Sequence, residues 1–158
     1  MKQMVKQTLP RNAFFFILML VAFVAGPLYG KEEKVQQPKE YGVYLKTSQS
    51  LVRLLPNMVF NEQGLLYVES NKPQQFMLKD IQYFVVYGKY DMKVLTINPL
   101  VFFQASAVGK PRFKIGQDLP IDVKDNGKGL YTVKPKDLLG RGYYCLWIED
   151  QVWDFVIE

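Results

Sequence analysis

The stretch that decides the fold class is GRGYYCLWIEDQVWDFVIE, residues 140–158. It contains two short runs of apolar and aromatic residues, 142–148 and 152–157, separated by the polar turn EDQ (149–151). Runs of this length and composition on either side of a polar turn are typical of a β-hairpin. We therefore expect the chain to end in two antiparallel strands.

The hydrophobic pattern also predicts how these two strands face. With a loop of even length, even-numbered residues before the turn share a face with odd-numbered residues after it. The main core face then carries Tyr144, Leu146, Ile148, Trp153, Phe155 and Ile157. The second face carries Tyr143, Cys145, Trp147, Val152, Asp154 and Val156. This arrangement is favoured because Asp154 then lies on the less buried face, and burying a charge is costly.

The same signature continues along most of the chain. From residue 41 on, short runs rich in Val, Ile, Leu, Tyr and Phe are bounded by turn residues. No stretch in this part sustains a helical apolar period for three turns. The pattern predicts an all-β domain with strands near 41–47, 51–55, 65–69, 81–87, 93–97, 100–104, 112–115, 119–123, 130–134, 142–148 and 152–157.

Two of these strands indicate their own place in a sheet. IQYFVVYG (81–88) is apolar on both faces, which is expected of a strand in the middle of a covered sheet. In LPIDV (119–123) apolar and polar residues alternate, so one face of this strand is expected to be exposed to solvent. Pro120 lacks an N–H, which predicts that this strand is an edge or begins at a bulge.

The first thirty residues have the order of an export signal. Three basic residues precede an apolar run, and Gly30 fits the small residue that comes before a cleavage site. The apolar stretch 13–29 is close to the lower length limit for a membrane span. We expect residues 1–30 to be a signal peptide or, if uncleaved, an N-terminal membrane anchor.

The sequence pattern predicts the domain boundaries and the cellular location of the protein. Residues 31–40, KEEKVQQPKE, are charged and Gln-rich and are interpreted as a polar tether. Residues 41–158 are interpreted as one β-domain. Either fate of the signal predicts an exported domain, periplasmic or extracellular, with an inner-membrane anchor through residues 13–29 if the signal is uncleaved.

The charge balance gives no reason to expect a nucleic-acid partner. The chain has 20 basic and 15 acidic residues, and three basic but no acidic residues lie within 1–30. The rest therefore has 17 basic and 15 acidic residues, a net charge of +2. The basic run GKPRFKIG (109–116) is interpreted as the polar face of a strand in an exported domain.

Residues that commonly carry chemistry are scarce. One Cys excludes an internal disulfide, and the absence of His removes the commonest general base and metal ligand. The chain contains no spacing typical of an activated nucleophile, a phosphate loop or a metal site. We expect no enzyme activity, no catalytic residue, no cofactor and no metal.

The second face of the terminal hairpin is the candidate functional surface. If the opposite sheet or a loop covers this face, its aromatic residues belong to the core and Cys145 is a small apolar filler. If it is open, Cys145 is a thiol that can pair between chains, and the exposed aromatic patch predicts partner binding. The residues of that patch are Tyr143, Trp147, Val152 and Val156.

A family resemblance points the same way. YGVYLK (41–46) opens the domain, and a strand, a Pro-containing loop, a Leu-x-x-Gly-x-Tyr element and a last apolar strand close it. This arrangement resembles a loose group of exported bacterial β-sandwich domains, and the resemblance implies their fold and compartment but no catalytic residues. The matching residues are Pro135, Leu139, Gly142, Tyr144 and Phe155.

We therefore expect a single antiparallel β-sandwich, Ig-like in the broad sense, over residues 41–158. The expected function is a non-enzymatic binding or accessory module of the cell envelope that interacts with another protein. The alternative is a carrier or binder of a small apolar ligand or glycan, held between the sheets or against exposed aromatics. A hollow interior favours the carrier, and a flat apolar patch favours the module.

Overall fold

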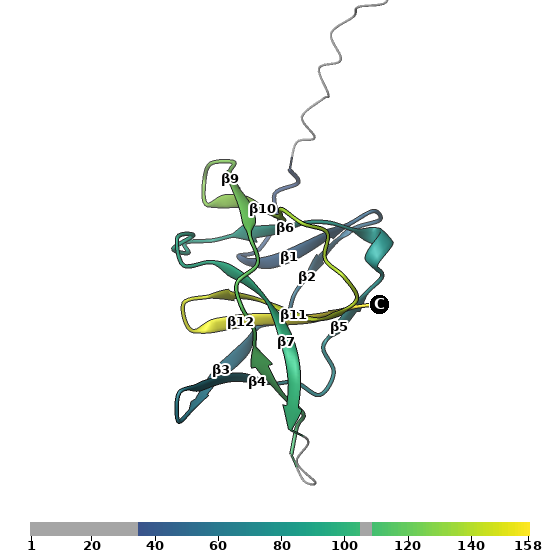
Figure 1. Ribbon diagram of the computed structural model, residues 1–158. Coiled ribbons are helices and arrows are strands. Elements are labelled where there is room, and N and C mark those ends of the chain that lie inside the picture. The colour runs from purple at the N-terminus through teal and green to yellow at the C-terminus, as the bar shows by residue number, and fades with distance from the viewer. Residues whose placement is uncertain (1–34, 105–108) are drawn as a thin grey trace, which may run out of the picture. The chain divides into compact units, whose positions relative to one another are not determined.

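The computed structural model describes residues 35–104 and 109–158, which belong to one compact unit (Figure 1). The predicted signal or anchor lies outside the described residues, as does the beginning of the predicted tether. The described chain is all-β, with one 3₁₀ turn, η1 (Leu78–Asp80). Its strands are β1 (Gly42–Thr47), β2 (Leu51–Arg53), β3 (Asn57–Glu62), β4 (Leu65–Glu69), β5 (Gln74–Phe76), β6 (Ile81–Tyr87), β7 (Thr96–Gln104), β8 (Arg112–Ile115), β9 (Ile121–Asp125), β10 (Leu130–Pro135), β11 (Gly142–Ile148) and β12 (Gln151–Ile157).

The all-β class is confirmed, and three strands differ from the sequence prediction. The pattern does not predict β3, whose sequence NMVFNE is polar at both ends, or β5, which has only three residues. The two runs predicted at 93–97 and 100–104 fall largely in one strand, β7, although Asn98-Pro99 between them is a common turn pair.

Pro99 is tolerated inside β7 because its backbone bonds through its carbonyl alone. Its C=O accepts a hydrogen bond of 2.8 Å from Gly116 N. Asn98 is buried, and its side-chain amide donates to Gly116 O at 3.0 Å and to Asp118 Oδ1 at 2.8 Å. These bonds satisfy the polar groups around Asn98 and Pro99, so a pair that commonly forms a turn is accommodated within a continuous strand.

The strands form two sheets. The first has five strands in the order β2-β1-β6-β10-β9, all paired antiparallel. The second follows the order β11-β7-β8-β4-β3-β12, and β11 also pairs with β12, so these six strands close into a ring. β5 adds to β12 in parallel outside the ring. A simple sandwich of two open sheets is therefore not confirmed, because one sheet closes on itself.

The terminal hairpin has the predicted register. A two-residue loop, Glu149-Asp150, joins β11 to β12, and Trp147 lies opposite Val152. The pairing of even-numbered with odd-numbered residues continues to the end of the hairpin. The assignment of residues to the two faces is thus confirmed.

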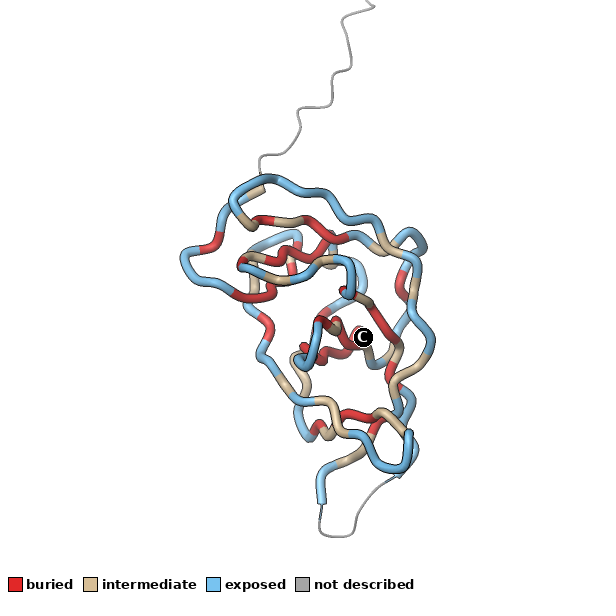
Figure 2. Tube along the Cα trace, turned by 90° about the vertical axis from the view of Figure 1, so that its left-hand side faces the viewer, coloured by how far each residue is buried: buried red, intermediate tan, exposed pale blue. Residues whose placement is uncertain are grey.

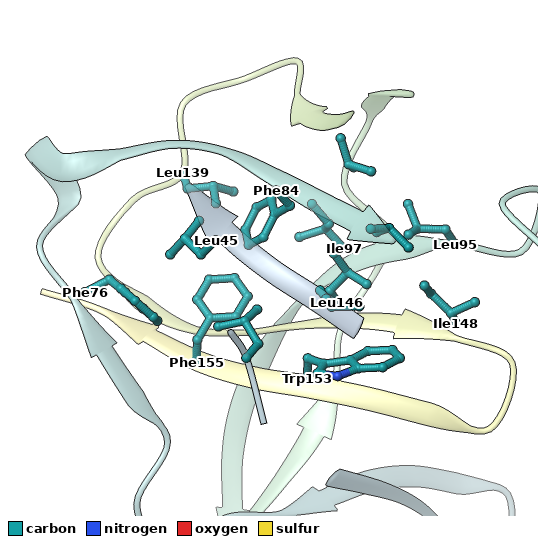
Figure 3. Close-up of a cluster of buried hydrophobic side chains, with 14 of the residues drawn as sticks. Leu45, Phe76, Phe84, Leu95, Ile97, Leu139, Leu146, Ile148, Trp153 and Phe155 are labelled. Carbon is teal, nitrogen blue, oxygen red and sulfur yellow. The ribbon is translucent and has the colours of Figure 1, made fainter. Parts of the chain in front are cut away.

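The main core lies between the five-stranded sheet and one face of β7, β11 and β12. Leu45 and Phe84 from the first sheet pack with Leu146, Trp153 and Phe155 from the terminal hairpin, and all five side chains are at most 2% exposed. Figure 3 shows these side chains pointing toward one another. The predicted core face of the hairpin is the core face in the structure.

The second face of the hairpin is also covered, because the closed sheet curls over it. Cys145 and Val152 are fully buried in a second cluster with Val68 and Phe113, which come from β4 and β8. Asp154 lies on this face and is only 8% exposed. This face is less buried than the core face only at Tyr143 and Trp147, so the expectation that Asp154 escapes burial on it is wrong, and the reason is the closure of the sheet.

The positions predicted for two other strands are confirmed. β6 is the middle strand of the five-stranded sheet and is buried on both faces, with Phe84 in the main core and Val85 in a separate cluster on the outer face. β9, which follows Pro120, is an edge strand with mostly exposed residues.

Gly42 and Gly142 begin β1 and β11 in the same unusual conformation, with φ of 153°. This region of φ favours glycine. Two residues later, the hydroxyls of Tyr44 and Tyr144 each donate to the carbonyl four residues upstream, at 2.8 and 3.1 Å. The Gly-x-Tyr pattern therefore fixes how the chain enters two strands that line the main core.

Candidate functional site

The structure does not bring the four predicted binding residues into one exposed patch. Val152 and Val156 are buried, at 0 and 8% exposed. Tyr143 is 41% exposed and Trp147 is half-buried. The closed sheet covers the middle of this face, so only the two ends of β11 approach solvent. The expectation of a patch that includes the two valines is corrected, and a binding role for Tyr143 or Trp147 stays a prediction.

Trp147 lies at one end of the closed sheet. Its ring packs against the Cys145 cluster, and its Nε1 donates to Glu149 O at 2.8 Å. It also lines an open hollow of about 410 Å³. The other lining residues are Asp91, Val94, Thr96, Asp118 and Glu149. Trp147 is therefore partly a core residue and partly the apolar wall of an acidic hollow.

Tyr143 lies at the other end and belongs to a row of aromatic rings. It stacks on Phe113, with ring centroids 4.8 Å apart and planes inclined by 28°. Phe113 is buried and meets the exposed Phe102 edge-on at 5.8 Å. The row thus connects β11, β8 and β7 across the end of the sheet.

A second row of rings lies on the outer side of the closed sheet, on β7, β4 and β3. Phe103 meets Tyr67 edge-on at 5.8 Å, and Tyr67 stacks on Phe60 at 5.4 Å. The Arg112 guanidinium lies 4.9 Å from the centre of the Tyr67 ring. This cation–π contact and the stacking fix the position of the Tyr67 ring, against which Phe103 packs.

The exposed residues at this end of the closed sheet are called the aromatic end. It consists of the exposed side chains of Val101, Phe102, Phe103 and Tyr143, which are 57, 55, 39 and 41% exposed. Figure 1 shows β7 running beyond β11 to the lower end of the view, and Figure 2 shows the described residues at that end as exposed. Val101, Phe102 and Phe103 are the longest run of consecutive exposed apolar residues within a described strand.

The sequence pattern predicts a strand at 100–104 but not the exposure of its side chains. The available signal was the absence of any polar residue among Val101, Phe102 and Phe103. Such a run also fits a strand that is covered on both faces. The exposure arises because β11 begins at Gly142 and pairs with β7 no further than Leu100.

A polar cluster surrounds Asp154 inside the closed sheet. The Ser70 hydroxyl donates to one carboxylate oxygen, and Asn57 Nδ2 donates to the other at 2.9 Å. Asn57 Nδ2 also donates to Glu69 O at 2.9 Å. Asp154 reaches a hollow of about 300 Å³ whose lining includes Lys72. Since both carboxylate oxygens accept hydrogen bonds, we interpret Asp154 as structural.

Cys145 lies opposite Asp154 and is fully buried. Burial raises the pKa of its thiol strongly, and the negative charge of Asp154 raises this pKa further. A thiol that stays protonated and out of reach is a poor nucleophile. Of the two alternatives, the structure therefore supports the small apolar filler.

We expect this thiol to make stability fall at alkaline pH. Above about pH 8.5 the unfolded chain loses the Cys145 proton while the folded chain keeps it. The free energy of unfolding should then decrease by up to about 1.4 kcal/mol per pH unit, with no such effect below pH 8. Urea unfolding at pH 7 and at pH 9.5 measures this, with Cys145→Ala as the control that lacks the effect. An identical pH dependence in both proteins would contradict the burial of Cys145.

The described residues contain no group of three or more Cys, Asp or Glu side chains placed to hold a metal ion. Every buried side-chain nitrogen or oxygen in this part of the chain has a hydrogen-bond partner. No helix within residues 35–104 and 109–158 has the length and hydropathy needed to cross a membrane.

Comparison with known proteins identifies no relative of this chain. No family model matches the chain, and neither a curated protein nor a solved structure matches it. The function is therefore inferred from the residues of this chain.

Proposed function

We propose that this protein is a non-enzymatic binding or accessory module of the cell envelope, and that it docks another protein through the aromatic end. The observation that carries the proposal is the exposure of three consecutive apolar side chains, Val101, Phe102 and Phe103, on one strand. Contiguous exposed apolar surface marks interaction sites, and a few aromatic anchors usually supply most of an interface's affinity.

The rings of the aromatic end are held in place before any partner arrives. Phe102 rests against Phe113, and Phe103 rests against Tyr67, which is only 6% exposed. A rigid anchor loses little conformational freedom on binding, so more of its contact energy appears as affinity. This support from buried rings distinguishes the aromatic end from apolar residues that are exposed singly.

The interior of the closed sheet favours the module over the carrier. It is filled by the side chains of the second cluster, among them Val68, Phe113 and Cys145, which are at most 5% exposed. A carrier of an apolar ligand needs an apolar cavity that encloses most of that ligand. The hollows beside Trp147 and Asp154 are lined by polar as well as apolar residues and lie at the surface. The more apolar hollow beside Leu119 and Tyr144 has only about 140 Å³, less than a ligand pocket usually needs.

The compartment and the family relationship are part of the same proposal. Export rests on the order of basic and apolar residues within 1–30. The relationship to exported Ig-like sandwich domains rests on the elements that close the chain, around Gly142 and Tyr144. The packing of β1 and β6 against β11 and β12 across the main core supports a two-layer arrangement in this part of the domain.

The proposal predicts that the double variant Phe102→Ser, Phe103→Ser binds its partner at least about tenfold more weakly, because two aromatic anchors are lost. The free energy of unfolding should change by no more than about 1 kcal/mol, since both side chains are substantially exposed. Capture of partner proteins from membrane extracts on the immobilised protein, together with urea unfolding, measures both quantities.

The matched control is Val123→Ser, which removes a 41% exposed apolar side chain from the edge strand β9. It should leave capture unchanged. Equal losses in the double variant and in the control would show that the aromatic end has no special role.

A further inference from the structure

We propose that the partner docks as an added β-strand along the free edge of β7 at Val101–Gln104, and that this strand is an extended apolar segment carrying acidic residues. This inference rests on the proposed function and deepens it by naming the chemistry of the partner. Addition of a peptide to an exposed sheet edge is a recurring mode of recognition, in which main-chain hydrogen bonds give affinity and alternate side chains give specificity.

The end of β7 is paired on one side only. β11 pairs with β7 as far as Tyr143 opposite Leu100, whereas β8 continues to Gln104 opposite Arg112. No strand among the described residues pairs with the other side of Val101–Gln104. Val59–Glu62 of β3 is likewise paired only with β4, and Val101–Gln104 is the unpaired edge that adjoins the aromatic end.

The hydrogen bonds of β7 show which backbone groups face this edge. Pro99 O accepts from Gly116 N, so the backbone of Pro99 points toward β8. Backbone groups along an antiparallel strand point alternately to its two neighbours. Val101 therefore also points toward β8, and the N–H and C=O of Phe102 point to the free edge. A partner strand can exchange two hydrogen bonds with Phe102.

Side chains on both faces of this edge are apolar. Phe102 lies on the side of Phe113 and Tyr143, and Phe103 lies on the side of Tyr67. A strand paired with this edge would place alternate side chains against these two aromatic rows. The register shift between Phe102 and Gln104 limits regular pairing to a short segment.

The edge strand β9 is protected against such pairing, and the free edge of β3 ends in the polar Asn61 and Glu62, whereas Val101–Gln104 has no such protection. β9 follows Pro120 and carries charged residues at Asp122, Lys124 and Asp125. Proline and charges at an edge discourage pairing with another chain. Val101–Gln104 contains neither.

The charges beside the edge favour an acidic partner. Lys114 of β8 lies opposite Val101, is exposed, and has no ion-pair partner among the described residues, whereas Lys110 lines the hollow that also contains Glu69 and Asp154. Arg112 is already paired with Glu69 at 3.0 Å and with Glu62 at 3.3 Å. The Lys114 ammonium group would attract carboxylates of a docked strand and repel basic segments, which sets specificity more than affinity.

Three fluorescein-labelled heptapeptides test the proposal on the full chain by fluorescence anisotropy. The first is Glu-Val-Glu-Phe-Glu-Val-Glu, the second has Lys in place of each Glu, and the third is the first with alternate backbone amides methylated. We expect the first peptide to bind at least about tenfold more tightly than either of the others, because the second reverses the charge and the third cannot complete the ladder.

Two variants at one position separate the backbone from the side chain. Phe102→Ala removes the ring and keeps the N–H, whereas Phe102→Pro removes both, and a proline whose nitrogen faces a free edge is compatible with a strand. We expect Phe102→Pro to lose at least about tenfold more affinity for the first peptide than Phe102→Ala. If Phe102→Pro does not unfold cooperatively, the methylated peptide on the unaltered chain decides the point alone.

Three results would overturn strand addition. The methylated peptide could bind as tightly as its parent. The peptides could fail to bind while vesicles of phosphatidylglycerol and phosphatidylcholine do, which would assign the edge to an anionic membrane surface. Sedimentation could show a dimer that Phe102→Pro abolishes, which would assign it to a second copy of this chain. The proposed function fails separately, if Phe102→Ser, Phe103→Ser captures its partner normally.

Discussion

Phe155→Ala is expected to lower the free energy of unfolding by about 3–5 kcal/mol, the usual cost of emptying a buried aromatic site. Phe155 is fully buried in the main core. Its ring lies 5.3 Å from that of Phe84 across the two sheets and 5.9 Å from that of Tyr144 on the neighbouring strand. The cavity left by alanine would lie between the two sheets. Side chains of neither sheet can fill it unless the backbone of one sheet shifts. Urea unfolding at neutral pH measures the loss.

The control for this change is Leu138→Ala, whose side chain is 99% exposed. It should alter the free energy of unfolding by less than about 0.5 kcal/mol. If the two variants are equally stable, the packing of β12 against the five-stranded sheet is wrong.

Asp154→Ala is expected to cost about 1.5–3 kcal/mol, although the sequence pattern alone predicts a small effect. The change leaves the Ser70 hydroxyl and the Asn57 amide without their acceptor inside the closed sheet. Hydrogen bonds to a charged group are stronger than neutral ones, and a buried donor left without a partner pays its full desolvation penalty. The same urea unfolding experiment measures the effect.

Asp154→Asn is the matched variant, because it keeps the shape of the side chain and one acceptor oxygen. Its loss should be smaller than that of Asp154→Ala. An alanine variant as stable as the unaltered protein would indicate that this face of β12 is open to solvent and that the sheet does not close over it.

The parts of the fold that depend on local pattern could be predicted from the sequence. The register of the terminal hairpin follows from placing Trp153 and Phe155 inside, because a slip by one residue exposes both. The central place of β6 follows from its apolar residues on both faces, and the edge position of β9 from Pro120. In each case the residues of one short segment are sufficient to predict the structural feature.

The closure of the second sheet could not be predicted, because it depends on pairings between distant segments. It requires β3 to pair with the start of β12, and β3 has a polar sequence that does not indicate a strand. Without β3 and β4, the face that carries Cys145 and Asp154 looks open. The error about Asp154 and the inclusion of Val152 and Val156 in a binding patch share this origin.

The candidate site was predicted only in part for the same reason. Tyr143 was identified as an aromatic residue on the second face, and it does lie at the aromatic end. The sequence pattern places Phe102 and Phe103 in a strand and predicts no role for them. Their exposure depends on the difference in length between β7 and β11, and no local pattern encodes it.

The most direct test of the central claim is the amount of partner captured by Phe102→Ser, Phe103→Ser, divided by the amount captured by Val123→Ser. Both should be measured from the same membrane extract at equal amounts of folded protein. If the aromatic end is the docking surface, this ratio is about 0.1 or lower when the amount of immobilised protein is far below that needed for half-maximal capture, since the loss of two anchors weakens binding at least tenfold. A ratio near one, with both variants folded, would contradict the account.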